Sequence, residues 1–270
     1  MERGTQAVSA AVPKGRTHNS ATGREGMAER IYLHEVIDII LSGRANYFDH
    51  MMKGLVDWGH DRGMRIHGIW GTLGSTARWP EVINIWEYGD WENVANIFAH
   101  ETRGHPGMQD PALKEWWLIA QKYRSGGFDR LMQARDCSID ADDLGARGIA
   151  GHDVFRHEIV GVQPGEANTY LDRIEGEWAP YLKTLGIELV GAYRTLLRDD
   201  SEAILVWSCP TWENWGEAEK AIDQSDQGKA WRASVRPMVT NFRTDLMVSA
   251  PRSPTKTGRQ PSRDDPPAVL

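Results

Sequence analysis

Two stretches of the chain alternate apolar and polar residues with the period of a half-buried β-strand. They span residues 31–37 and 154–160 and are rich in β-branched and aromatic side chains. After each stretch the apolar positions follow a helical period instead. In the first helix they are Phe48, Met51, Met52 and Leu55, and in the second Leu171, Ile174, Trp178 and Leu182. The pattern predicts two strand–helix units of the same design.

The two units stay alike beyond these helices. Gly63 and Gly186 stand where a left-handed residue ends a helix. A hairpin follows each glycine, then a helix that begins after Asp90 or Thr211, and then a last strand. The predicted strands lie at 65–73, 82–86 and around 131–132, and at 187–197, 203–207 and around 246–247. Each unit is therefore β-α-β-β-α-β, the ferredoxin-like arrangement.

The sequences of the two units also match. Residues 34–73 align with residues 157–196 without a gap at an offset of 123. Trp86 then matches Trp207 at an offset of 121, and Trp116 matches Trp231 at an offset of 115. The identities in the first block are His34/His157, Glu35/Glu158, Tyr47/Tyr170, Asp49/Asp172, Gly63/Gly186, Gly68/Gly191, Thr72/Thr195 and Leu73/Leu196. A period this long exceeds a solenoid unit, so we interpret the chain as two fused copies of one domain.

The domain boundaries follow from this duplication. We expect repeat 1 at residues 30–136, a linker at 137–152 and repeat 2 at 153–250. Residues 1–29 and 251–270 are polar and lack an apolar period, which predicts disordered tails.

Each predicted sheet has helices on one face only. The opposite apolar face would be open, and soluble proteins avoid such a surface. We therefore expect an α+β fold in which the two antiparallel sheets pack face to face within one chain. Function is then expected where the two copies meet.

Composition and charge exclude several partners. The net charge is -7, which gives no basic field for a nucleic acid. No apolar run is long enough to span a bilayer, and the N-terminus lacks a signal-peptide core, so we expect a cytoplasmic protein without a membrane partner. Cys137 and Cys209 belong to no metal motif, and no metal site is expected. Twelve tryptophans favour a cavity for an apolar ligand.

One segment carries a family resemblance. The run Gly68-Ile69-Trp70-Gly71-Thr72-Leu73-Gly74, followed by Glu81-Val82-Ile83-Asn84-Ile85-Trp86-Glu87-Tyr88 and a helix, resembles the hallmark of NIPSNAP-type domains. The resemblance implies a tandem NIPSNAP-like protein of the dimeric α+β barrel superfamily. That superfamily includes cofactor-free monooxygenases, muconolactone isomerase, polyketide cyclases and haem enzymes, so fold does not settle activity. The second copy keeps Gly191, Tyr193, Thr195 and Trp207 but has Cys209 in place of Tyr88.

Alternation along the strands suggests which side chains line the cavity. Asn84, Trp86 and Tyr88 share one strand face, while Ile83 and Ile85 share the other. We expect the isoleucines to pack under the helices and the other three to face the space between the sheets. The same interpretation adds the substrate-binding candidates Trp70, Trp86, His157, Tyr193 and Trp207.

His34 is the candidate general base, because histidine titrates near neutral pH. Its duplicate His157 supports an alternative in which both histidines are structural, since a base needed once need not appear twice. His67 is expected to face solvent or the helices, opposite Trp70.

The sequence favours an enzyme that abstracts a proton from a hydrophobic or aromatic metabolite, of the cofactor-independent monooxygenase, isomerase or lyase type. His34 would be the base, with Asn84 and Tyr88 orienting the substrate or stabilising an enolate. No cofactor is expected, and the fused chain could form a homodimer. The alternative is a non-catalytic protein that binds a hydrophobic ligand or a partner. A haem enzyme is the third reading, and it requires a single axial histidine.

Overall fold

The order of elements in the first half of the chain recurs in the second half. The computed structural model describes residues 29–76, 78–102, 110–262 and 264–265. The strands are β1 (Ile31–Ile39), β2 (Arg65–Thr72), β3 (Glu81–Gly89), β4 (Arg124–Ala134), β5 (Val154–Val162), β6 (Glu188–Thr195), β7 (Glu202–Cys209) and β8 (Val239–Ser249). The helices are α1 (Arg44–His50), α2 (Val56–His60), α3 (Trp91–Glu101), α4 (Pro111–Ala120), α5 (Ala167–Arg173), α6 (Ala179–Thr184), α7 (Trp212–Gln224), α8 (Asp226–Val235) and α9 (Pro254–Thr257). The π-helical turns η1 (Met51–Leu55) and η2 (Ile174–Trp178) join α1 to α2 and α5 to α6.

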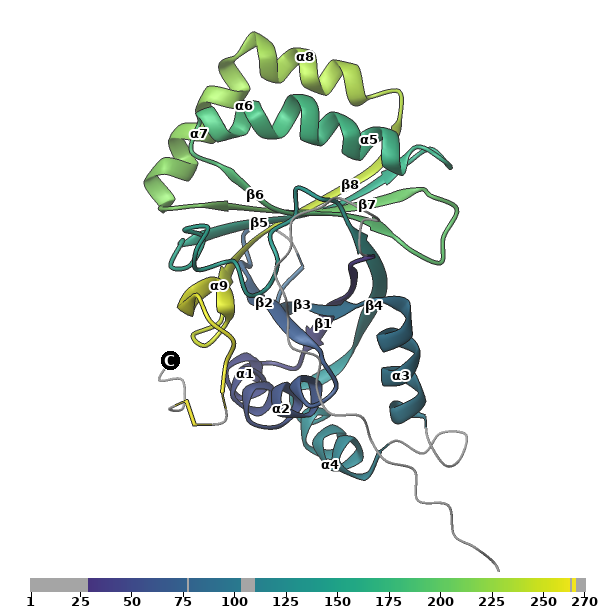
Figure 1. Ribbon diagram of the computed structural model, residues 1–270. Coiled ribbons are helices and arrows are strands. Elements are labelled where there is room, and N and C mark those ends of the chain that lie inside the picture. Colours follow the sequence, from purple (N-terminus) through teal and green to yellow (C-terminus); the bar gives the residue numbers. More distant parts are fainter. Residues whose placement is uncertain (1–28, 77, 103–109, 263, 266–270) are drawn as a thin grey trace, which may run out of the picture.

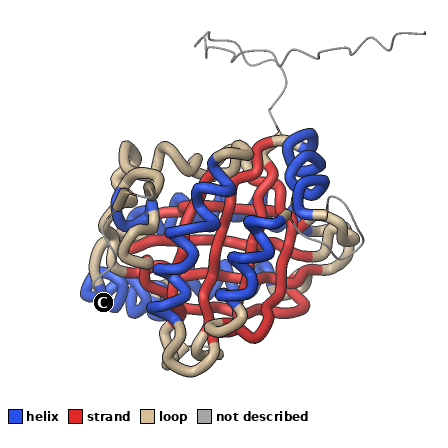
Figure 2. The backbone as a smooth tube through the Cα atoms, turned by 90° about the horizontal axis from the view of Figure 1, so that it is seen from below, coloured by secondary structure: helices blue, strands red, loops and turns tan. Residues whose placement is uncertain are grey.

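All eight described strands form one closed barrel in the order β1-β3-β2-β8-β5-β7-β6-β4. The strands pair antiparallel, so the predicted α+β class is confirmed. Only three residue pairs join β2 to β8 and three join β4 to β6, whereas β1 and β4 pair along nearly their full length. Helices α5 to α8 cover one side of the barrel, and α1, α2 and α4 lie on the opposite side (Figure 1). Figure 2 shows the helices lying over strands of the barrel.

The barrel interior is filled mainly by apolar side chains. Ile83 and Ile85 belong to this interior cluster, together with Trp70 and Tyr193. Trp86 and Tyr88 instead pack in the cluster between β3 and the helices, and Trp207 does so in the second half. The predicted facing of β3 is therefore wrong. Alternation is real, but residues 81–86 are buried on both faces of the sheet, so the sequence pattern does not show which face is inside.

A β-bulge changes the facing of β2. Ile66 pairs with Trp86 and Gly68 with Ile85, which leaves His67 as an extra residue. His67 lies inside the barrel, where its Nε2 is 2.8 Å from the carbonyl oxygen of Ile139 and its ring is edge-on to that of Tyr32. The prediction that His67 faces solvent or the helices is wrong, because alternation counted back from Trp70 does not include the bulge.

Two segments outside the strands complete the barrel. The expected linker contributes Ile139, Leu144 and Ile149 to the interior cluster. The expectation that the tail is disordered from residue 251 is wrong for residues 251–262, which contain α9 and pack on β2 (Figure 1). The predicted N-terminal tail lies outside the described residues except for Glu29. Among the helices that the structure describes, none has the length and apolar character needed to cross a membrane.

Candidate functional site

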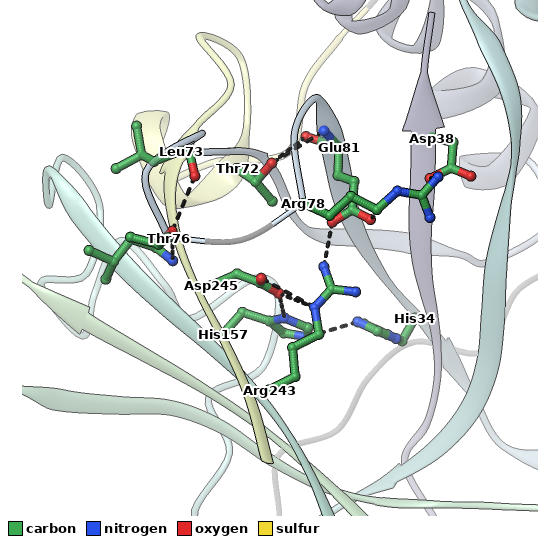
Figure 3. Close-up of polar contacts among 11 residues, drawn as sticks. His34, Asp38, Thr72, Leu73, Thr76, Arg78, Glu81, His157, Arg243 and Asp245 are labelled. Atoms are coloured by element: carbon green, nitrogen blue, oxygen red, sulfur yellow. Dashed lines mark hydrogen bonds and ion pairs between the residues drawn. The ribbon is translucent and has the colours of Figure 1, made fainter. Parts of the chain in front are cut away.

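His34 and His157 meet at the centre of the barrel. Both rings are fully buried, and their Nε2 atoms lie 2.9 Å apart (Figure 3). They come from β1 and β5, and their rings are stacked with centroids 4.9 Å apart. The two histidines that align in the sequence are therefore in direct contact, and His34 lies inside the barrel.

A chain of charged groups connects this pair to the barrel edge. His157 Nδ1 is 3.3 Å from Asp245 Oδ2, which also accepts a hydrogen bond of 2.9 Å from Arg243 Nε. Arg243 in turn pairs with Glu81 on β3 (Figure 3). If His157 donates from Nδ1 to Asp245, its Nε2 accepts from His34 Nε2–H. His34 Nδ1 is then left without a proton or a partner, in agreement with its lack of any hydrogen bond.

This environment makes His34 a poor general base. Burial, and then the neighbouring His157, hold its pKa well below the usual 6.5. A base must also reach its substrate, and the side chain of His34 is 0% exposed. The geometry therefore favours the structural alternative for the two histidines, which join β1 to β5 inside the barrel.

Cavities lie outside the barrel, between sheet and helices. One, here called the N-terminal cleft, has a volume of about 420 Å³, within the range of small-molecule sites. Trp86 and Tyr88 line it together with the apolar side chains Leu33, Trp58, Phe98 and Trp117. Two of the predicted site residues thus do line a cleft, although a different one from that expected. Trp70 and Tyr193 are fully buried inside the barrel.

Three carboxylates share the N-terminal cleft: Glu35, Glu101 and Asp129. Glu35 Oε2 accepts hydrogen bonds from Trp86 Nε1 at 3.0 Å and from Asn84 Nδ2 at 3.1 Å. Among the ion pairs of the described residues, none includes any of these three carboxylates. Sequence reasoning missed Glu101 and Asp129, since neither has a counterpart in the other half and no motif surrounds them.

Burial shifts the protonation of this cluster. It raises the pKa of Glu35, and it raises the pKa of Glu101 to about 7 with a further contribution from Glu35 and Asp129. The pKa of Tyr88 is raised well above 10 by burial, so its phenol stays protonated. The cleft therefore offers a carboxylate that is about half ionised at neutral pH beside a neutral hydrogen-bond donor.

A second cleft, here called the C-terminal cleft, has a volume of about 600 Å³ and lies between strands β5 and β8 and helices α5, α7 and α8. Glu158, which aligns with Glu35 in the sequence, accepts a hydrogen bond of 3.1 Å from Trp207 Nε1. In contrast to Glu35, it also forms an ion pair of 3.0 Å with Arg156. The alignment places Leu33 opposite Arg156, so Glu35 lacks the arginine that pairs with Glu158, although Arg130 lines the N-terminal cleft.

A haem and a metal ion each need particular ligating side chains. The described residues that line the two clefts include no histidine, so they do not fit the single axial histidine of the haem reading. Within the described residues no group of three or more His, Cys, Asp or Glu side chains is arranged to hold a metal ion.

Comparison with known proteins gives a likeness in fold. No protein-family model matches the sequence, and no curated protein matches it. The structure is similar to that of an anthrone oxidase-like protein, with 14% identity, a TM-score of 0.61 and coverage of 89% of this chain and 97% of that one. It is also similar to a proposed monooxygenase of Fusobacterium nucleatum, with 12% identity, a TM-score of 0.54 and coverage of 82% and 93%.

A NIPSNAP family protein of unknown function from Agrobacterium tumefaciens matches 44% of this chain and 96% of its own length, with 16% identity and a TM-score of 0.33. At such identities a likeness shows the fold alone. The chain therefore has the fold of the dimeric α+β barrel superfamily to which its sequence resemblance points.

Proposed function

We propose that the protein is an enzyme that removes a proton from a flat, apolar substrate bound in the N-terminal cleft. The observation that carries this proposal is the grouping of Glu35, Glu101 and Asp129 in one largely apolar cleft, without an ion pair among the described residues. Glu35 is buried and Glu101 is partly buried, whereas Asp129 is exposed. An unpaired carboxylate is costly to bury, and a cleft that holds one is a candidate site of acid–base chemistry.

Each side chain has a role in this proposal. Glu101 is the base, because a pKa of about 7 leaves about half of it ionised and able to accept a proton at neutral pH. Tyr88 donates a hydrogen bond to the oxygen that gains negative charge in the substrate. Trp86 holds Glu35 and forms the wall of the cleft. Asn84 acts through Glu35 and does not touch the substrate.

Anthrone is the first substrate to test, since one neighbour in fold is described as anthrone oxidase-like. It is a flat tricyclic ketone with an acidic CH2 group. In the proposed reaction Glu101 takes a proton from this CH2 group, and Tyr88 hydrogen-bonds the resulting enolate oxygen. The carbanion adds to O2, and the peroxide loses water. Anthrone and O2 thus become anthraquinone and water, with no reductant required.

The contrast between the clefts rests on a related proposal, that the two halves of the chain are copies of one unit. It is supported by the ungapped alignment, by the recurring order of elements and by the paired contacts of Trp86 with Glu35 and of Trp207 with Glu158. On this proposal the copies have diverged in charge, and only the first retains unpaired acids.

Oxygen uptake and anthraquinone absorbance with anthrone as substrate test the proposed function. We expect Glu101→Gln to lower kcat by about 100-fold or more, the usual contribution of a general base. Glu92→Gln, an exposed position on the same helix α3, is the matched control and should leave kcat unchanged. Wild-type kcat should rise with pH around the pKa of Glu101, about 7.

Leu33→Arg gives a second test, because it introduces the cation that Arg156 provides in the other half. We expect the arginine to lower the pKa of the nearby carboxyls and to move the pH profile of kcat to lower pH. Unchanged anthrone turnover in Glu101→Gln would show that Glu101 is not the base. If the wild type turns over none of a panel of flat carbon acids, the non-catalytic reading is favoured instead.

A further inference from the structure

The C-terminal cleft has a wall of large aromatic side chains. Trp178 and Trp231 stack with ring centroids 5.1 Å apart and an angle of 5° between their planes. Tyr170, Trp215 and Phe242 also line the cleft, and the ring of Phe242 is 50% exposed. Flat apolar surfaces of this kind favour offset or edge-on contact with an aromatic ligand. An exposed phenylalanine within a cleft costs free energy that a bound ligand would recover.

The same cleft carries three arginines. Arg156 lies at its base, where Nη1 donates to Glu219 at 2.9 Å and Nε lies 3.0 Å from Glu158. Its Nη2 is buried and has no partner, although guanidinium donors are seldom left unsatisfied. Arg232 and Arg236 also line the cleft, and both are exposed. Arg156 pairs with Glu158 and Glu219, and Arg232 lies 3.6 Å from Asp223, so Arg236 is the one cleft arginine with no ion pair among the described residues.

The charges distinguish this cleft from the N-terminal one. The positions aligned with Arg156 and Arg232 hold Leu33 and Trp117 in the first half. Glu158 is already paired with Arg156, so it is not available as a base. The C-terminal cleft therefore offers a ligand the unsatisfied Nη2 of Arg156 and the guanidinium of Arg236, and among its described residues it holds no free base.

We propose that the C-terminal cleft is a separate binding site for an aromatic carboxylate, whose ring packs on Trp231 and Phe242 and whose carboxylate faces Arg156 and Arg236. Its volume of about 600 Å³ accommodates a ligand of two or three fused rings. The free Nη2 of Arg156 supplies a buried donor, and a hydrogen bond between charged groups is about twice as strong as a neutral one.

Calorimetric titration of the full chain with 2-naphthoate and with its neutral analogue 2-naphthamide tests this inference. We expect naphthoate to bind about tenfold more tightly than naphthamide, because only the acid forms charge-assisted hydrogen bonds. We expect this preference to shrink as salt is added, since Arg232 and Arg236 are exposed to solvent.

Substitutions at two exposed positions of the cleft locate the bound probe. Arg236→Gln should weaken naphthoate about fivefold and leave naphthamide unchanged, and Phe242→Ala should weaken both. The matched controls are Arg147→Gln, an exposed arginine on the 137–152 segment, and Phe128→Ala, a phenylalanine that is also 50% exposed. Neither control residue lines the C-terminal cleft, so both variants should bind naphthoate as the wild type does.

Glu101→Gln separates this inference from the proposed enzyme function. It should abolish turnover and leave the affinity for naphthoate unchanged. Equal affinity for the acid and the amide, or wild-type binding by Arg236→Gln, would overturn the inference. The inference would also be overturned if Leu33→Arg or Glu101→Gln lost naphthoate binding while the variants of the C-terminal cleft kept it, since the probe would then occupy the N-terminal cleft.

Discussion

At Gly68 the backbone passes directly beneath the ring of Trp70. A Cβ atom on Gly68 would lie 2.0 Å from that ring, and a Cβ atom on Gly191 would lie 2.2 Å from the hydroxyl of Tyr193. Both glycines are next to a bulge, where the aromatic residue two positions later folds back over the strand. The Gly-x-Trp part of the NIPSNAP-like motif is thus explained by packing inside the barrel.

We predict that Gly68→Ala destabilises the protein, because neither the buried ring of Trp70 nor the paired strand has room to move. Overpacking of this kind costs about 1–3 kcal/mol of unfolding free energy in a urea titration. Gly216→Ala is the matched control. A Cβ atom at Gly216 meets nothing within 4 Å on helix α7, so this variant should be neutral or more stable. Equal stability of the two variants would contradict this packing argument.

The difference between the N-terminal and the C-terminal cleft depends on a few side chains. Glu35 and Glu158 align in the sequence, but the effect of Leu33 opposite Arg156 appears only when the strand face is known. Glu101 follows from no pattern, because its raised pKa depends on the fold that brings β1 and β4 beside α3. The sequence therefore predicted the fold better than it predicted the residues of the candidate site.

At the scale of elements, hydrophobic period and capping residues predicted the order of strands and helices. Asp90 and Thr211 do cap α3 and α7, accepting hydrogen bonds from Asn93 N and Asn214 N. The period did not predict which face of β3 is inside, because both faces are buried. It also did not predict that each hairpin loop reaches across to the other half. Thr76 lines the C-terminal cleft and Leu197 lines the N-terminal one.

The C-terminal segment was missed for a similar reason, since its contacts with the barrel are polar. Ser253 Oγ accepts a hydrogen bond of 3.0 Å from Ile69 N. The Gln260 side chain accepts from Ile66 N at 2.9 Å and donates to Ile66 O at 2.8 Å. Its amide thereby satisfies main-chain groups of β2 as a neighbouring strand would.

We predict that Gln260→Ala lowers the unfolding free energy by about 1–3 kcal/mol, because it leaves a main-chain donor and acceptor of Ile66 without partners. Gln227→Ala, at an exposed position on α8, is the matched control and should have little effect. The measurement is a urea titration followed by circular dichroism. If both variants match the wild type, the segment after α9 does not stabilise β2.

At the scale of the whole molecule, the contact between His34 and His157 makes the two halves sensitive to acid. The pKa of each imidazole is lowered by burial, so both stay neutral in the folded barrel below the usual pKa of 6.5. The unfolded chain takes up protons first as the pH falls through 6.5, and unfolding is favoured. A buried carboxyl with a raised pKa, such as Glu35, takes up its proton in the folded chain before the unfolded one, so it favours the folded state as the pH falls.

Comparison with His34→Leu separates these opposing effects. The variant removes one imidazole that must stay neutral and leaves His157 bonded to Asp245. Between pH 6.5 and 5.5 we expect the unfolding free energy of the wild type to fall relative to that of the variant by up to about 1.4 kcal/mol. Urea titrations at several pH values give this difference. Parallel pH curves would show that His34 titrates alike in the folded and unfolded chain, which a ring enclosed between two sheets should not do.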